Sequence, residues 1–195
     1  MICSRRTKTM AIGLTLLMLG IILASTLSQA QTEIPLADLA IQPGILADNP
    51  ERIKAGMVHV DDPSQPLSRA TANLPQVKDD LLLNYKEAYR VEGFDEKRGV
   101  YVGNYVYRYT DASQVEAVAQ AFLDSVTAHK GELLSDDLGG KQVLFVGSAG
   151  DGIYWHIGVK DNVLMLLMVN GPVSPQTQAV FQDLIKALPD GILQQ

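Results

Sequence analysis

The sequence predicts an α+β fold, a two-layer sandwich in which a largely antiparallel sheet of about five strands carries two helices on one face. Two observations lead to this prediction. Between residues 81 and 170, five segments either alternate apolar and polar side chains or are apolar throughout, as strands are. Two segments with helical spacing interrupt and close this series, which yields the order ββαβββα.

The first thirty residues are typical of a signal peptide. Arg5, Arg6 and Lys8 precede an apolar run over residues 11–27, and small residues up to Ala30 form a cleavage site. The alternative is an uncleaved anchor formed by residues 11–27, which is short for a hydrocarbon core about 30 Å thick. The paired arginines match a twin-arginine signal in part, so both this route and general secretion stay open. In either case we expect a periplasmic or extracellular domain, because positive charge stays inside.

Composition narrows the classes of partner. The chain has a net charge of -6, and loss of residues 1–30 leaves 13 Lys and Arg against 22 Asp and Glu, or -9. A domain this acidic is not expected to bind nucleic acid, and a membrane only through an uncleaved leader. The single cysteine, Cys3, lies in the leader, so the exported domain is free of cysteine and needs a hydrophobic core for its stability.

The remaining chain divides into three parts. Residues 31–80 are rich in proline and contain only short apolar pieces, which predicts an irregular segment packed on the core. Residues 81–190 carry the α+β domain, and residues 191–195 form a tail. Within the domain, the strand from Leu81 to Val91 leads through a polar turn at 93–98 into a second strand at 99–109, as in an antiparallel hairpin.

Capping residues place the two helices. Asp111 is an N-cap with Gln114 in the capping-box position, and this helix is expected to end near Lys130. Ser174, followed by Pro175, starts the second helix. Three further strands are expected between the helices, at 141–147, 152–160 and 163–170. The apolar helix stripes comprise Val115, Val118, Ala119, Phe122, Leu123 and Val126, and Val180, Phe181, Leu184, Ile185 and Leu188.

Alternate positions of the second strand are tyrosines. Since a buried tyrosine ring can still bring its hydroxyl to a partner, whereas Asn104 and Arg108 would be costly inside, the tyrosine row is predicted to face the core. Gly103 lies in the same row and would make room for a large neighbour.

The opposite row then predicts a basic outer face. Its residues would gather positive charge on an otherwise acidic domain and could bind an anionic ligand or an acidic partner. The alternative is an ordinary solvated face whose cations pair with glutamates such as Glu87 or Glu92. The expected ligand-binding residues are Lys86, Arg90, Arg108, Tyr154, His156 and Lys160, with Asn84 and Asn104 on the same face.

Signals for catalysis and metal binding are few. His59, Asp61 and Asp62 are the nearest approach to a ligand cluster, and a polar loop segment before Pro63 is the favoured explanation for them. No phosphate loop, nucleophile elbow or calcium loop is present, so no catalytic residue, resident metal or cofactor is expected. A metal-assisted hydrolase built on the three residues is the alternative function.

The order of elements is similar to that of a known group of exported domains. The hairpin that leads through "YTDASQVEAVAQAF" into a helix, together with the final "NGPVSPQTQAVFQDLIKALP", resembles small α+β domains of the PsbP and Mog1 type. This resemblance implies an assembly or binding role without catalysis and transfers no site residue. The sequence therefore predicts an exported, non-catalytic binding or assembly module of the cell envelope, whose partner is an envelope protein or a small anionic ligand.

Overall fold

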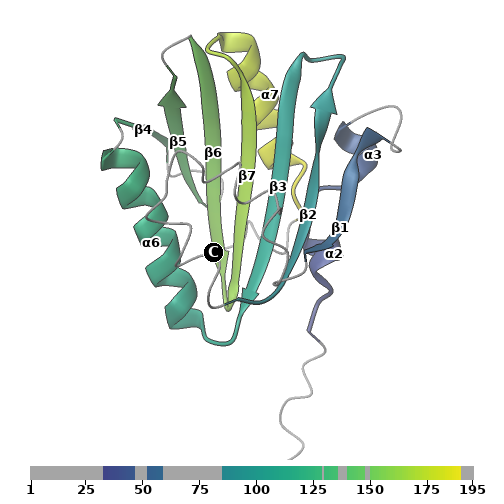
Figure 1. Ribbon diagram of the computed structural model, residues 1–195, viewed down its shortest axis with the longest axis vertical. Helices are drawn as coiled ribbons and strands as arrows, with labels where there is room; N and C mark the ends of the chain where they lie inside the picture. The colour runs from purple at the N-terminus through teal and green to yellow at the C-terminus, as the bar shows by residue number, and fades with distance from the viewer. Residues whose placement is uncertain are drawn as a thin grey trace, which may run out of the picture. The chain divides into compact units, whose positions relative to one another are not determined.

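The computed structural model describes residues 33–46, 52–58, 85–128, 130–135, 140–147 and 150–189. From Pro35 onward the chain is one compact unit built on a seven-stranded sheet. Neighbouring strands are antiparallel throughout, in the order β1-β2-β3-β7-β6-β5-β4 (Figure 1). The strands are β1 (Lys54–Val58), β2 (Tyr85–Asp95), β3 (Val100–Tyr109), β4 (Glu132–Ser135), β5 (Lys141–Val146), β6 (Asp151–Lys160) and β7 (Val163–Pro172). The helices are α2 (Leu36–Leu39), α3 (Pro43–Leu46), α6 (Ala112–Ala128) and α7 (Pro175–Lys186).

The α+β class and the antiparallel sheet are confirmed, but the sheet has seven strands where about five were expected. The two additional strands, β1 and β4, are its edges. β1 lies in the segment that was expected to be irregular, and β4 has only four residues. Strands this short carry too few alternations for a period of two to be recognised.

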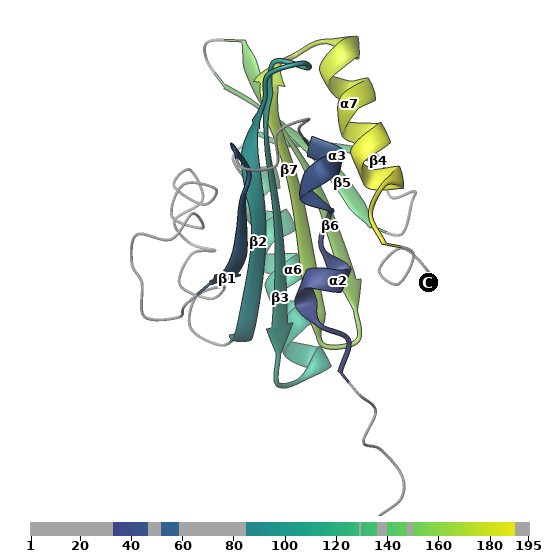
Figure 2. The same ribbon diagram turned by 90° about the vertical axis from the view of Figure 1, so that its right-hand side faces the viewer.

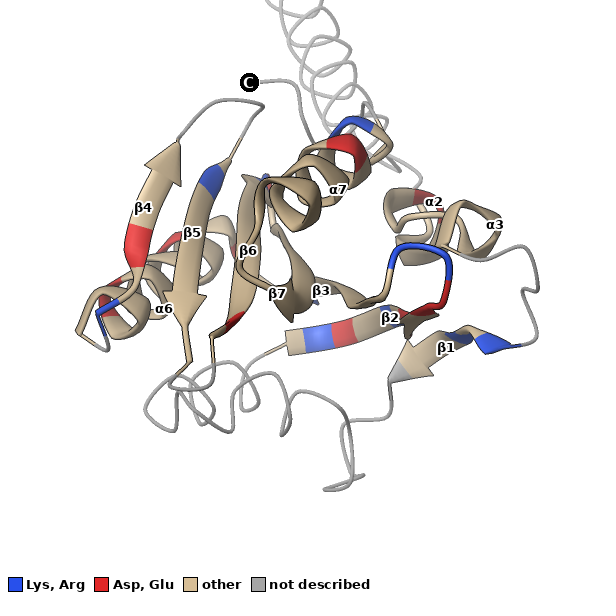
Figure 3. Ribbon diagram, turned by 90° about the horizontal axis from the view of Figure 1, so that it is seen from above, with Lys and Arg blue, Asp and Glu red and all other residues tan. Residues whose placement is uncertain are grey.

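The two long helices cover opposite faces of the sheet, so the expectation that both pack on one face is wrong. Residues of α6 share a buried cluster with Leu164 and Leu166 of β7, whereas residues of α7 share another with Met165 and Leu167. Successive side chains of a strand point to opposite faces, so the two clusters lie on opposite sides of β7. Figure 3 shows α7 and α6 on different sides of the sheet.

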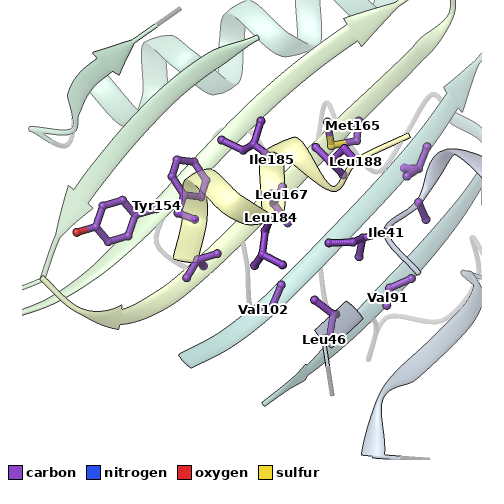
Figure 4. Close-up of a cluster of buried hydrophobic side chains, with 14 of the residues drawn as sticks. Ile41, Leu46, Val91, Val102, Tyr154, Met165, Leu167, Leu184, Ile185 and Leu188 are labelled. Carbon is purple, nitrogen blue, oxygen red and sulfur yellow. The ribbon is translucent and has the colours of Figure 1, made fainter. Parts of the chain in front are cut away.

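The face covered by α7 is aliphatic. Figure 4 shows Leu184 and Ile185 of α7 above the side chains of β3 and β7, with Ile41 and Leu46 beside them. The last two residues belong to the segment of α2 and α3, which lies on the same side as α7 (Figure 2). The part of residues 31–80 that contains α2 and α3 therefore packs on the core, as expected.

Asn104 ties this segment to the sheet. Its side chain Oδ1 accepts a hydrogen bond from the backbone N–H of Ile41 at 2.8 Å, and its Nδ2 donates to the carbonyl of Leu166 at 3.2 Å. A buried amide with both ends satisfied costs little, because the hydrogen bonds replace those it made with water.

The face covered by α6 is aromatic. Trp155 of β6 meets Phe122 of α6 edge-on, with ring centroids 5.1 Å apart. Tyr105, Tyr107 and Tyr109 are buried in the same cluster, as predicted, but Asn104 and Arg108 of the opposite row are buried as well, so the expectation that this row faces solvent is wrong.

The helix starts agree with the sequence. Asp111 accepts a hydrogen bond from the Ser113 backbone N–H at 2.7 Å, and Ser174 Oγ accepts one from the Thr177 N–H at 3.1 Å. The side-chain oxygen of Gln114 finds no hydrogen-bond partner in the described part of the chain. None of the helices in the described ranges is long and apolar enough to cross a bilayer. Residues 1–30 lie outside these ranges, so cleavage or anchoring of the leader stays a prediction.

Candidate functional site

The basic outer face predicted from the sequence does not exist as one surface. Arg90 pairs in register with Tyr105 and therefore shares the α6 face, whereas Arg108 pairs with Val163 and shares the α7 face. The irregularity in the pairing between Tyr85 and Glu87 contributes to this outcome, because a shift of one residue exchanges the two sides of a strand. The two arginines cannot bind one ligand.

Most of the other predicted ligand-binding residues are inside the protein. Tyr154 packs against Phe181 of α7, with ring centroids 5.5 Å apart, and His156 is fully buried on the same face. Lys86 is exposed at the irregular end of β2, and Lys160 is partly exposed at the end of β6. The cause of the error is α7, which covers the face that was expected to be wet.

Each arginine has a glutamate partner on the sheet, as the alternative interpretation predicted, but the face is not the solvated one that this interpretation assumed. Arg108 is buried and forms an ion pair with Glu87. Arg90 lies 3.5 Å from Glu92. The Arg108 pair therefore belongs to the interior of the protein.

The metal hypothesis falls outside what the structure describes. His59, Asp61 and Asp62 are not among the described residues, and neither is Asn84. Among the residues that are described, no group of three His, Cys, Asp or Glu side chains is placed to hold a metal ion.

The structure does bring together a row of side chains that the sequence did not single out. Five residues, one from each of five adjacent strands, lie in register across the α6 face at one end of the sheet. They are Phe94, Tyr101, Asn170, Ile153 and Phe145, named here the open row. At a strand separation of about 4.8 Å, the open row spans roughly 19 Å.

The open row is accessible because α6 stops short of it. Figure 1 shows α6 along the lower part of the sheet, with the upper ends of β6, β7 and β3 extending beyond it. Phe94 is 52% exposed and Asn170 is exposed, while Tyr101, Ile153 and Phe145 are partly buried. A row of exposed and partly exposed aromatic and aliphatic side chains, interrupted by Asn170, is a candidate interaction surface.

The sequence did not predict the open row because one of its residues, Phe94, was assigned to the wrong element. Phe94 was assigned to a polar turn, but β2 continues through Asp95, and the turn follows at Glu96 to Gly99. Gly99 has a φ of 69°, a left-handed conformation that favours glycine, and Asp95 accepts hydrogen bonds from the Arg98 backbone and guanidinium. The Asp95 to Gly99 spacing is the signal that would have placed this turn.

A buried polar contact lies next to the open row, on the same face of the sheet. The Tyr105 ring folds back over Gly103, where a Cβ atom would come within 2.6 Å of the Tyr105 hydroxyl, so any larger residue would have to displace this ring. That hydroxyl donates to Glu92 Oε2 at 3.3 Å, and only 5% of Glu92 is exposed. The expectation that Gly103 makes room for a large side chain is thus confirmed.

The tyrosines of this face stay protonated. Burial, followed by the charge of Glu92, raises the pKa of Tyr105, and burial likewise raises the pKa of Tyr107 and Tyr109. The hydroxyls of Tyr107 and Tyr109 have no hydrogen-bond partner within the described ranges. These rings therefore add neutral, buried area to the α6 face and no charge.

Comparisons with known proteins leave the chain without a family. No protein-family model matches it, and none of the curated proteins compared with it does. Among solved structures, it is similar to the extracellular domain of PknH from Mycobacterium tuberculosis, with 14% identity, a TM-score of 0.47, and coverage of 69% of this chain and 83% of that one. At this TM-score the likeness carries no argument about function. The class that the fold and site define is an antiparallel α+β domain with helices on both faces of the sheet and a partly exposed aromatic row on the α6 face.

Proposed function

We propose that this chain is an exported, non-catalytic binding module of the cell envelope, and that it docks a protein partner on the open row. The single observation that supports docking is the exposure of Phe94 in register with four other side chains of that row. Protein interfaces are enriched in aromatic residues at their cores, and a few such residues carry most of the binding energy. The leader-like residues 1–30 and the similarity to PsbP and Mog1 domains support export and a non-catalytic role.

The test is site-specific photo-crosslinking in cells that produce and export the protein. It compares the adducts formed at two exposed apolar positions. Phe94 is 52% exposed, and Met57 of β1 is 49% exposed but pairs with Tyr89, on the α7 side of the sheet. A photo-crosslinking amino acid at position 94 is expected to give a discrete adduct that the same amino acid at position 57 does not give. Equal labelling at both positions, or an adduct at 57 alone, would contradict docking on the open row.

Export is tested separately. Mass spectrometry of the protein recovered from the envelope fraction is expected to show a chain that begins at Gln31. A chain that retains residues 1–30 would instead support an anchor at 11–27, and recovery only from the cytoplasm would contradict the localisation.

A further inference from the structure

Two cations lie on the α6 face beside the open row, at its β1 and β2 end. Lys54 is exposed and pairs in register with Glu92, and Arg90 pairs with Tyr105. Both register partners share the face that carries Phe94. Figure 3 shows positive segments, in blue, on β1 and in the turn that follows β2.

These two cations have few ion-pair partners among the residues that the structure describes. Lys54 makes no ion pair with any residue that the structure describes, and the Arg90 side chain is 25% exposed. The one ion-pair contact of the Arg90 guanidinium among the described residues is the 3.5 Å approach to Glu92 Oε1, at the outer limit of a hydrogen bond. A guanidinium has five N–H donors and this contact engages only the Nη1 nitrogen, so donors remain for a ligand at the exposed part of the side chain.

The neighbouring carboxylate of Glu92 offsets only part of this charge, because one anion stands against two cations. Glu92 is buried and accepts the Tyr105 hydroxyl, so it is shielded from an incoming ligand. Lys54, which is exposed, and Arg90, which is partly exposed, therefore leave an excess of one positive charge over Glu92, in a chain whose net charge is -6. Arg in particular suits recognition of a carboxylate, because its planar donors match the two oxygens.

We infer that the partner of the open row is an extended polypeptide segment that carries an apolar anchor and an acidic side chain, the apolar residue packing on the open row and the carboxylate binding between Lys54 and Arg90. This inference rests on the proposed function and adds the chemistry of the partner. Peptide is favoured over an anionic polysaccharide because the open row consists mainly of Phe, Tyr and Ile side chains, which pack on the apolar side chains of another protein.

The strand geometry sets the spacing in the partner. On one face of a strand, side chains recur every second residue, about 6.7 Å apart. Glu92, in register with Lys54, is one such step from Phe94, and Arg90 is two steps away. An extended segment that runs along β2 would therefore place its acidic residue about two to four residues from its apolar anchor.

The experiment measures binding of short labelled peptides to the exported protein by fluorescence anisotropy. The probe has an aspartate about four residues from a phenylalanine, and its matched peptides carry asparagine for the aspartate or serine for the phenylalanine. The double variant Lys54→Gln with Arg90→Gln is expected to lose about three- to tenfold in affinity for the aspartate probe and to bind the asparagine probe unchanged. Lys160→Gln, on the α7 face, is the matched control and should leave both affinities unchanged.

Each outcome bears on one of the two proposals. If Phe94→Ser abolishes binding and the cation variants change nothing, the inference that the partner carries an acidic side chain is wrong, whereas docking on the open row is supported. If Phe94→Ser has no effect, the docking surface itself is overturned. If a polyanionic polysaccharide binds as tightly as the peptide and depends on Lys54 and Arg90 alone, the partner is not a polypeptide. If no probe binds at any workable concentration, the inference also fails.

Discussion

The two faces of the sheet bury their side chains by different means. The α7 face is aliphatic, is covered by α7 together with α2 and α3, and satisfies its central amide, Asn104, twice. The α6 face is aromatic, is covered by one helix, and leaves two buried tyrosine hydroxyls without partners among the described residues. It also ends in the open row. The α7 face, which more elements cover, contributes mainly to stability, whereas the α6 face also retains a surface for binding.

The difference between the two faces is tested most directly by truncating one phenylalanine on each face. Phe181 is fully buried under α7, so Phe181→Ala should lower the free energy of unfolding by about 3–5 kcal/mol. Phe94→Ala should change it by less than about 0.5 kcal/mol, because the side chain is already half in water. Urea denaturation of the two variants measures both effects. Equal losses would show that Phe94 is part of the core, and the open row would not be a free surface.

The α7 face should respond to acid through His156. Both of its ring nitrogens lack partners within the described ranges, and burial lowers the pKa of His156 to about 4 from 6.5. The unfolded chain therefore takes up this proton below about pH 6.5 and the folded chain only near pH 4, so stability falls as the pH is lowered between these values. The loss attributable to this residue approaches about 3 kcal/mol.

The measurement for His156 is the free energy of unfolding as a function of pH in the native protein and in His156→Leu. The carboxylates titrate in both proteins, so the difference between the two curves isolates the histidine. A difference that does not change between pH 7 and pH 4.5 would show that His156 is hydrated or paired.

A smaller effect is expected where the α2 and α3 segment is tied to the sheet. Asn104→Ala leaves the Ile41 N–H buried without its acceptor, at a cost of about 1–3 kcal/mol. Hydrogen exchange at the Ile41 amide should accelerate with it. Unchanged exchange would mean that the segment is held by its apolar contacts alone.

The smallest effects distinguish satisfied from unsatisfied hydroxyls on the aromatic face. Tyr105→Phe removes the donor to a buried carboxylate and should cost about 1–2 kcal/mol. Tyr107→Phe removes a hydroxyl without a described partner and should be neutral or stabilise by up to about 1 kcal/mol. Thermal unfolding of the matched pair gives the answer. A clear loss with Tyr107→Phe would reveal a partner for its hydroxyl.

Local patterns predicted much of the fold. The positions of the main strands, the start of α7 at Ser174 and the buried stripe that includes Phe181 and Leu184 are as expected. These features depend on neighbours within a few residues, such as a cap and the N–H that it accepts from. The two edge strands β1 and β4 and the irregularity near Lys86 were missed, since short edge strands and a register shift leave almost no trace in alternation.

The sequence by itself determined the α+β class, the antiparallel pairing of the hairpin and the inward orientation of the tyrosine row, because periodicity and caps are local properties. Only the tertiary structure decided which helix covers which face, and with it the fate of Arg90, Arg108 and His156. The physical reason is that a polar side chain is tolerated inside once it finds a partner, as Arg108 does with Glu87, and that partner comes from another strand. The open row likewise exists only through register across five strands, which no single segment of the chain encodes.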